Sequence, residues 1–329
     1  MKKNFGNLEK KFILIYLDIF FSQINFKKFL NTNKNQNKIF SHISTHRDDS
    51  DLIDVNKDNQ IIQIYNKNNN KKSLSRTSIS GIFLLHKSLF HKIKIKKFDL
   101  TKLIIKQIRK TTFYSYFTNE NFNDFGTKER YKKLIKNYNK NLKNFSIILD
   151  RDGTILSENT FLNSERKIRF YSQFIDFLRV LKDKKIILVC ITNQPGIAKG
   201  FIKDQKVNKI HNSLNRKLFK KLGLAFDRFY YCPHHPDSGF KGEIKKLKIK
   251  CQCRKPNSEL FLKAINDYDL DKNFIINIGN SFSDIQAGMR SGVKNNFLIN
   301  HKIKKKDKKK NYTVLNFKDL IKEIRKFKI

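Results

Sequence analysis

Apolar runs of strand length alternate with amphipathic segments of helical period through the second half of the chain. The apolar runs lie at residues 145–149, 186–191, 226–231, 274–278 and 296–299. The helical segments lie at residues 170–181, 204–222, 285–292 and 317–327. This alternation predicts an α/β fold with a Rossmann-like parallel sheet flanked by helices. We expect the lysine run at 302–310 to be a solvated loop.

The first 140 residues show the same two periods in a looser arrangement. Strand-like runs lie at 12–18, 61–65 and 82–85, and helix-like segments at 26–30 and 100–108. Thr127 is expected to be the N-cap of a further helix. We therefore divide the chain into residues 1–140 and residues 141–329, each of ordinary domain size.

The composition is strongly basic, but the basic residues are dispersed. Lys and Arg number 70 and Asp and Glu 29 among 329 residues, which gives a formal net charge of +41. A charge of this size usually indicates nucleic acid or an anionic membrane as a partner. Here lysines accompany Asn, Ile and Phe along the whole chain, which indicates biased residue usage. We therefore do not expect nucleic acid as a partner.

No segment of the sequence predicts a membrane anchor. The apolar run at 12–21 is too short to span a bilayer and contains Asp18. The chain has four cysteines, and three of them lie between residues 232 and 253. This pattern favours a metal site in a reducing compartment over a disulfide framework. We therefore expect a cytoplasmic protein.

Two aspartates follow the apolar run that ends at Leu149. Asp150 and Asp152 stand one residue apart and are followed by Gly and Thr, a turn signal. Ligands of open α/β sheets bind beyond the carboxyl ends of strands, so both carboxylates would line a crevice. Like charges this close need separated pKa values or a metal ion. The plain alternative is a strand that runs into an Asp-Gly turn.

Cysteine and histidine form a second pattern, in the loop 232–253. Cys232-x-His234 and Cys251-x-Cys253 offer three thiolates and one imidazole, the ligand set of a structural zinc site. With four protein ligands, such a metal would hold the loop together and take no part in catalysis. The alternative is a set of buried cysteines with surface histidines.

Together these motifs resemble the haloacid-dehalogenase-type phosphatases. The matching segments are Asp150-Arg151-Asp152-Gly153-Thr154, Thr192-Asn193-Gln194, the cysteine loop with Arg254-Lys255-Pro256, and Gly279-Asn280 with Asp284. The zinc-bearing loop is similar to that of the D-glycero-D-manno-heptose 1,7-bisphosphate phosphatase and histidinol phosphatase branch. The resemblance covers residues 145–300. It implies Mg²⁺-dependent hydrolysis of the 7-phosphate of a heptose bisphosphate in heptose or surface-glycan precursor synthesis, with histidinol phosphatase as the alternative.

The resemblance also implies roles for individual residues. Asp150 would attack phosphorus and form an aspartyl-phosphate, and Asp152 would act as general acid and then as base. Thr192 and Lys255 would stabilise the transferring phosphoryl group. Mg²⁺ would be bound by Asp150, Asp152, Asn280 and Asp284, and Zn²⁺ by Cys232, His234, Cys251 and Cys253. The candidates for binding the sugar phosphate are Glu158, Asn159, Thr160, Phe161, Asn193, Gln194, Arg254 and Ser281.

One metal position departs from the family pattern. The family has Asp where this chain has Asn280, and many heptose-type members have Lys where it has Ser281. An amide oxygen can bind Mg²⁺ but contributes no charge, so we expect weaker Mg²⁺ binding. An alternative of another class follows from this departure, an inactive pseudo-phosphatase or scaffold.

Most of residues 10–136 resembles the later half of the sugar-phosphate nucleotidyltransferases. Residues 14–21, 80–85 and 124–131 carry the resemblance, which implies that Asp18 and Asp124 match metal-binding acids of that family. The Gly-rich nucleotide-binding loop of the family has no counterpart before Asp18. We therefore expect a truncated region without transferase activity. Its pairing with a phosphatase favours a heptose substrate over histidinol phosphate.

Overall fold

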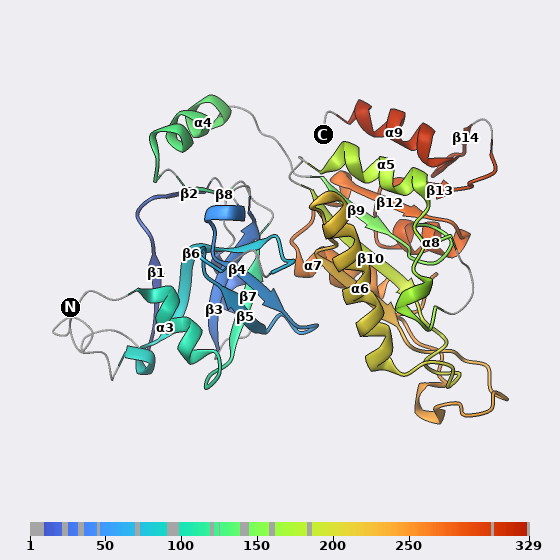
Figure 1. Cartoon of the computed structure of the whole chain (residues 1–329), viewed down its shortest axis with the longest axis horizontal. Helices are drawn as coiled ribbons and strands as arrows, with labels where there is room; N and C mark the ends of the chain where they lie inside the picture. Colours follow the sequence, from blue (N-terminus) through green and yellow to red (C-terminus); the bar gives the residue numbers. More distant parts are fainter. Residues whose placement is uncertain are drawn as a thin grey trace. The chain divides into compact units, whose positions relative to one another are not determined.

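The computed structural model describes residues 10–21, 26–31, 36–44, 47–69, 73–90, 99–118, 122–124, 126–138, 145–157, 162–182, 186–303 and 306–327. The chain divides into two units (Figure 1). Unit 1 comprises Met1–Lys143 with Asp267–Asp269, and unit 2 comprises Asn144–Asn266 with Leu270–Ile329. No helix within the described ranges is both long and apolar enough to cross a membrane.

A seven-stranded sheet forms the centre of unit 2 (Figure 1). Its strands are β9 (Ser146–Leu149), β10 (Ile187–Asn193), β11 (Arg228–Cys232), β12 (Ile275–Gly279), β13 (Asn295–Ile299), β14 (Asp307–Lys308) and β15 (Thr313–Leu315). The order is β11-β10-β9-β12-β13-β15-β14, and every pair is parallel except β14 with β15. Strand β9 therefore lies between β10 and β12, and the residues that follow these three strands leave the sheet at the same edge.

Helices cover both faces of this sheet. They are α5 (Ser172–Leu181), α6 (Asp204–Leu222), α7 (Glu259–Asp267), α8 (Phe282–Arg290) and α9 (Phe317–Lys326). Ile147 and Leu149 of β9 belong to one core cluster with residues of α5, α6 and α9, and α5 lies beside α9 (Figure 1). On the other face, the Asn277 side chain of β12 donates to the Asp284 carbonyl of α8 at 3.0 Å. This is the Rossmann-like α/β fold that the sequence predicts.

Some elements of unit 2 differ from the prediction. The lysine run at 302–310, predicted to be a loop, contributes the exposed strand β14. Backbone pairing with β15 forms this strand, so no apolar residue marks it in the sequence. Strand β15 and helix α7 are also missing from the prediction, although Leu260, Phe261 and Ala264 are buried at helical spacing in α7. Helix α6 has the predicted bounds.

Unit 1 is built on a mixed sheet of six strands. They are β1 (Lys11–Ile15), β3 (Asn37–Ile43), β4 (Leu52–Val55), β5 (Ile61–Tyr65), β6 (Thr77–His86) and β7 (Phe113–Phe117). The order is β5-β4-β6-β3-β7, with β1 also paired to β6. Strands β3 and β7 are parallel, and the pairs of β6 with β1, β3 and β4 and of β4 with β5 are antiparallel. Neighbouring residues of β3, Ile39 and Phe40, belong to two different hydrophobic clusters, so both faces of the sheet are covered.

The remaining elements of unit 1 are short. Strands β2 (Ile19–Phe21) and β8 (Phe122–Asp124) form a separate ribbon, and the helices are α2 (Phe26–Asn31), α3 (Leu100–Gln107) and α4 (Lys128–Tyr138). The predicted cap of α4 is confirmed, since the Arg130 N–H donates to Thr127 Oγ1 at 3.2 Å. Short 3₁₀ helices occur at Arg47–Asp49, Lys87–Phe90, Glu165–Lys167, Lys245–Leu247 and Lys272–Phe274 in the two units.

Candidate active site

Predicted site residues of unit 2 gather at the carboxyl ends of its parallel strands. Asp150 follows β9, Thr192 and Asn193 end β10, and Asn280 follows β12. The backbone N–H of Asp150 donates to the Ile278 carbonyl at 3.0 Å. This hydrogen bond continues the pairing of β9 with β12 to the edge of the sheet, so Asp150 is held on regular backbone up to the point where its side chain leaves the sheet.

The Lys255 ammonium lies between two buried carboxylates. Its Nζ is 2.6 Å from Asp150 Oδ1 and 2.7 Å from Asp284 Oδ1. It also donates to the Ile191 carbonyl at 2.7 Å. Burial by itself lowers the pKa of Lys255, but the two carboxylates outweigh burial and hold the pKa above its usual value. The ammonium therefore stays charged and neutralises part of the negative charge of the site.

The Asp150 carboxylate has different neighbours at its two oxygens. Oδ1 accepts from Lys255, and Oδ2 accepts from Thr154 Oγ1 at 3.3 Å. The same threonine hydroxyl lies 3.1 Å from Asn280 Oδ1. Burial raises the pKa of Asp150 to about 7, and Asp284 adds to this shift while Lys255 opposes it. A cation near Oδ2 would therefore favour the ionised form of Asp150.

Asp284 is fixed from two sides. Its Oδ1 faces Lys255, and its Oδ2 accepts the Ser281 backbone N–H at 3.0 Å in the capping box that begins α8. The carboxylate fits here because residue 279 is glycine, since a Cβ at Gly279 would lie 2.2 Å from Asp284 Cβ. The end of β12 and the start of α8 thus set the position of this acid.

The Asp152 carboxylate is bound by Arg151 and Gln194. Arg151 Nε and Nη2 donate to Asp152 Oδ1 and Oδ2 at 3.0 and 2.9 Å. Gln194 Nε2 donates to Asp152 Oδ2 at 2.8 Å and to Thr192 Oγ1 at 2.9 Å. The Asp152 side chain remains 26% exposed, whereas that of Arg151 is 1% exposed. The predicted acid–base residue is therefore accessible, and the groups that hold it are buried.

The other residues predicted to bind substrate are placed in different ways. The Asn193 side chain forms two hydrogen bonds with the backbone of Lys255. Its Oδ1 accepts from the Lys255 N–H at 3.0 Å, and its Nδ2 donates to the Lys255 carbonyl at 3.1 Å. Arg254 is partly buried, with Nη1 3.5 Å from the His234 carbonyl. Ser281 is exposed at the start of α8. The predicted residues Glu158, Asn159, Thr160 and Phe161 lie outside the described residues.

The four predicted zinc ligands converge. One ligand atom from each of Cys232, His234, Cys251 and Cys253 lies within 4.8 Å of the others. Cys253 Sγ is 3.1 Å from both Cys232 Sγ and His234 Nδ1. Three sulfur atoms and one nitrogen gathered in this way are the ligand set of a structural zinc ion. Contact with Cys232 and burial raise the pKa of the Cys253 thiol.

Three residues that hold the site together are not among the predicted site residues. Thr154 connects Asp150 with Asn280, Arg151 binds Asp152, and His211 Nε2 accepts from Arg151 Nη1 at 3.1 Å. Arg151 and Thr154 stand inside the motif of the two aspartates, and that position is the signal that could have identified them. His211 is 60 residues from Arg151 in a helical segment without a motif, so the sequence contains no signal for it.

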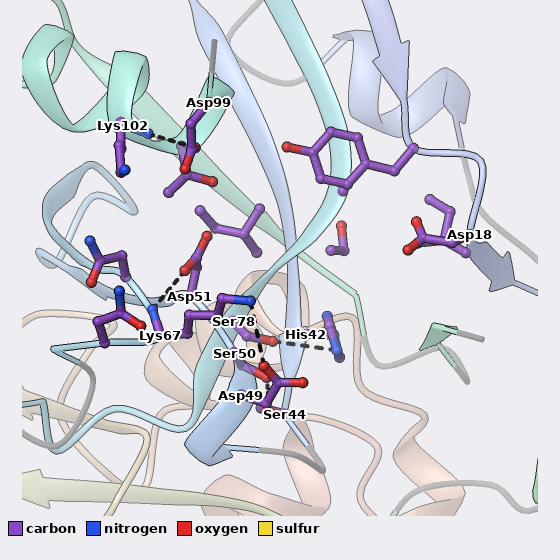
Figure 2. A pocket seen from close by; sticks show the side chains of 18 of the residues that line it. Asp18, His42, Ser44, Asp49, Ser50, Asp51, Lys67, Ser78, Asp99 and Lys102 are labelled. Atoms are coloured by element: carbon purple, nitrogen blue, oxygen red, sulfur yellow. Dashed lines mark hydrogen bonds and ion pairs between the residues drawn. The ribbon is translucent and has the colours of Figure 1, made fainter. Parts of the chain in front are cut away.

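A polar cavity of about 560 Å³ lies in unit 1 (Figure 2). Its charged lining residues are Asp18, Asp49, Asp51, Lys67, Asp99, Lys102 and Arg130. Arg130 Nη2 is 2.6 Å from Asp49 Oδ2, so one acid and one base of the lining are paired. Asp18, which the nucleotidyltransferase resemblance singles out, lies at this cavity, and the side chain of Asp124 lies outside the described residues.

Comparisons with known proteins agree with this geometry. A family model described as polynucleotide kinase 3 phosphatase matches residues 144–318, more than half of the chain. A D-glycero-beta-D-manno-heptose-1,7-bisphosphate 7-phosphatase of Haemophilus influenzae is 35% identical over 156 residues, which are 47% of this chain and 82% of that protein. The chain belongs to this family of haloacid-dehalogenase-type phosphatases. A D-glycero-alpha-D-manno-heptose-1,7-bisphosphate 7-phosphatase of Campylobacter jejuni is 31% identical over 166 residues, 50% of this phosphatase chain and 88% of that protein.

Two solved structures are less similar in sequence to this phosphatase than these two relatives are. D,D-heptose 1.7-bisphosphate phosphatase from B. bronchiseptica, complexed with magnesium and phosphate, has a TM-score of 0.46 at 24% identity and covers 56% of this chain and 99% of that chain. UDP-glucose pyrophosphorylase from Acinetobacter baumanii has a TM-score of 0.35 at 16% identity, over 41% of this chain and 53% of that chain. The family assignment therefore rests on the sequence matches.

Proposed function

We propose that this phosphatase hydrolyses the 7-phosphate of D-glycero-D-manno-heptose 1,7-bisphosphate. The observation that carries the proposal is the buried Asp150 carboxylate at the end of β9, 2.6 Å from Lys255 Nζ. A buried nucleophile beside a fixed cation suits attack on an anionic phosphate. The names of the two relatives support the choice of sugar, one with the beta and one with the alpha anomer, so the proposal covers both anomers.

In the proposed reaction, an Asp150 oxygen attacks phosphorus, the bond from phosphorus to the sugar oxygen breaks, and an aspartyl-phosphate forms. Asp152 gives its proton to the departing sugar oxygen. A water molecule then attacks the aspartyl-phosphate while Asp152 takes its proton, and release of phosphate restores Asp150. The exposed edge of Asp152 supports this role, because the proton must reach a substrate that enters from solvent.

Two further side chains would stabilise the transferring phosphoryl group. Lys255 supplies a buried positive charge next to the nucleophile. Thr192 is buried, and its Oγ1 accepts from Gln194, which leaves the hydroxyl proton available for a phosphate oxygen. Donors held in a site of low dielectric constant need no rearrangement when charge develops on the phosphate.

The proposed Mg²⁺ site consists of oxygen donors from Asp150, the Asp152 backbone carbonyl, Asn280 and Asp284. Mg²⁺ prefers such ligands. Their fit is supported by Asp150 Oδ2 and Asn280 Oδ1, which share the Thr154 hydroxyl as a neighbour. When bound, Mg²⁺ would neutralise charge on the phosphate. Because Asn280 contributes no charge, Asp150 and Asp284 would carry the electrostatic part of the binding.

The proposed Zn²⁺ site consists of Cys232, His234, Cys251 and Cys253, whose donor atoms fit a closed tetrahedral ion. No position for a water molecule or substrate remains with four protein ligands, so the ion would have a structural role. Lys255 comes two residues after Cys253. The zinc ion would therefore hold in place the loop that carries the catalytic lysine.

The first experiment measures phosphate release from D-glycero-D-manno-heptose 1,7-bisphosphate across a Mg²⁺ titration, with the native protein and Asn280→Asp in parallel. We expect turnover by both, with Asn280→Asp saturating at lower Mg²⁺ because it adds a charged ligand. Activity only in Asn280→Asp would mean that the native protein is the pseudo-phosphatase. Release from histidinol phosphate but not from the heptose would overturn the substrate proposal.

A second candidate function follows from the description of the family model, hydrolysis of a phosphate at a nucleic acid end. Because the formal net charge of +41 is dispersed along the chain, contact with nucleic acid that rests on charge alone should weaken as salt is raised. The same assay with a 3′-phosphorylated oligonucleotide tests this candidate. Preference for the oligonucleotide over the heptose, persisting when salt is raised, would replace the sugar proposal.

The proposal also covers the two parts of the chain and the location of the protein in the cell. Residues 141–329 form the phosphatase domain, and residues 1–140 form a nucleotidyltransferase-like region in which the residues before Asp18 supply no Gly-rich nucleotide-binding loop. The reduced cysteine cluster supports a cytoplasmic location, since reducing conditions keep thiolates available for zinc. Incubation of the protein with a sugar 1-phosphate and nucleoside triphosphates tests whether residues 1–140 transfer a nucleotide. We expect no nucleotide sugar, and its formation would refute this expectation.

A further inference from the structure

The hydrogen bonds of Asp152 lead away from the site toward a buried histidine. Arg151 binds both oxygens of Asp152, and its Nη2 also donates to Gln194 Oε1 at 2.8 Å. Its Nη1 donates to His211 Nε2 at 3.1 Å. Every nitrogen of the guanidinium therefore has an acceptor, although the group is buried. His211 is the acceptor for Nη1, whereas Nε and Nη2 are the nitrogens that bind Asp152.

The His211 ring is fixed by its surroundings. Its plane is 8° from that of Phe229, with ring centroids 4.3 Å apart, and Tyr231 packs edge-on at 5.5 Å. Ile210 and Leu214 on either side of it in α6 are fully buried in the core. The ring therefore cannot turn without disturbing the packing between α6 and β11.

The protonation of His211 suits an acceptor. Burial and the neighbouring Arg151 charge lower the pKa of His211 well below its usual value, so the ring is neutral. Because Nε2 accepts from Arg151, the proton is on Nδ1. Nδ1 has no hydrogen-bond partner among the described residues. An unpaired buried N–H lowers stability, so Nδ1 gives no reason to place a histidine here. The hydrogen bond that Nε2 accepts from Arg151 is the favourable polar contact of this side chain.

We infer that His211 is a positioning residue for phosphoryl transfer, which fixes the Asp152 carboxylate through the Arg151 guanidinium. The inference rests on the proposed function, in which Asp152 is the general acid and base. Without the acceptor at His211, a buried charged N–H loses its partner, and Arg151 has to rotate to find another. Asp152 then loses the two-point contact that sets its orientation.

The test compares three variants. His211→Phe keeps a ring against Phe229 but removes the acceptor, and His211→Gln supplies an acceptor again. Ser213→Ala is the matched control, since Ser213 is buried in the same helix and its hydroxyl contacts Glu165 instead of Arg151. Each protein is assayed with the heptose bisphosphate and with para-nitrophenyl phosphate. Nitrophenolate leaves without a proton, so formation of the aspartyl-phosphate from the second substrate does not need Asp152 as an acid.

We expect His211→Phe to lower kcat on the heptose bisphosphate by about 10-fold or more with KM nearly unchanged, since a general acid contributes about 100-fold or more to rate. The pre-steady-state burst of nitrophenolate should keep its rate. His211→Gln should recover most of the loss, and Ser213→Ala should show none. Equal losses in sugar turnover and in burst rate, or full activity of His211→Phe, would overturn the inference.

Failure of the proposed function gives a different result. If the native protein releases nitrophenolate but does not accept the heptose, the substrate proposal fails, and the comparison is repeated with an alkyl phosphate that the protein does accept. If it hydrolyses neither, crystal structures of the native protein and His211→Phe decide the inference. An Arg151–Asp152 pair that is unchanged in the variant would refute it, and a displaced Asp152 would support it.

Discussion

At the scale of single residues, Lys255 balances the charge of the phosphatase site. Lys255→Met leaves Asp150 and Asp284 buried without their shared cation. We expect the free energy of unfolding to fall by about 3 kcal/mol, and kcat to fall by about 100-fold or more. Urea unfolding and phosphate release measure the two effects, with Lys302→Met on an exposed loop as control. An unchanged stability would contradict the buried ion-pair arrangement.

Lys38 in unit 1 gives a prediction about pH. It is buried, and its Nζ donates to the Phe29 and Leu30 carbonyls at the end of α2. Burial lowers the pKa of Lys38 from 10.5 to about 8, with Lys11 adding to the shift. Between these two values the unfolded chain binds the proton more tightly than the folded one, so stability should rise with pH across this window. The measurement is thermal unfolding at pH 8 to 10.5.

The control for this effect is Lys38→Met, which removes the titrating group. Its stability should show a smaller rise over the same pH window than that of the native protein. An equal rise in both proteins would assign the pH dependence to the other lysines of the chain.

Residues inside a motif were predictable, and residues outside one were not. Asp150, Lys255 and Asp284 converge as expected, because each follows a strand or loop that the sequence marks. The contact of Arg151 with His211 spans 60 residues and depends on how α6 packs on the sheet. Residue types and spacing do not report such packing.

At the scale of elements, the connection from β12 to α8 is closely packed at Gly279. In Gly279→Ala, the added Cβ meets Asp284, and we expect a loss of about 2 kcal/mol in stability together with most of the activity. Gly223→Ala is the control, since a Cβ there meets nothing within 4 Å and only the left-handed backbone, with φ of 68°, is strained. It should lose about 1 kcal/mol of stability and keep its activity. Equal activity in both variants would contradict the role of the close approach.

The cysteine loop gives a prediction about metal removal. Cys251→Ser should lower the zinc content measured by atomic absorption and should lower kcat, because the loop leads directly into Lys255. The assay is run in excess Mg²⁺ so that only the structural ion is affected. Cys190→Ala is the control, since Cys190 lies in β10 outside the cluster. This variant should keep the zinc content of the native protein. Full activity in zinc-free protein would refute the supporting role of the loop.

The two sheets differ in how well the sequence predicted them. Strands β9, β10 and β12 are buried on both faces, so they are continuous apolar runs that the sequence shows directly. Strand β3 of unit 1 is almost as buried, but it carries Asn37, Lys38 and Ser41, and no apolar run indicates it. Hydrogen bonds to distant residues satisfy these polar groups, and the local sequence does not report them.

At the scale of the whole molecule, the two units have separate hydrophobic clusters. We therefore expect two unfolding transitions in calorimetry. Gly279→Ala should move one of them and Lys38→Met the other, with additive effects in the double variant. A single transition that both substitutions shift together would show that the units unfold as one cooperative body.

The contacts of Asn280 also affect the chemical stability of its side-chain amide. Asparagine followed by serine is prone to deamidation, in which the serine backbone nitrogen attacks the side-chain carbonyl carbon and ammonia leaves. Water then opens the resulting succinimide to isoaspartate and aspartate. Here the Ser281 N–H donates to Asp284 Oδ2, and Asn280 Oδ1 lies 3.1 Å from Thr154 Oγ1. Folding thus restrains both partners of that reaction. We therefore expect the folded protein to keep its amide, whereas unfolded chains slowly lose it, in part to the aspartate that the phosphatases it resembles carry at this position.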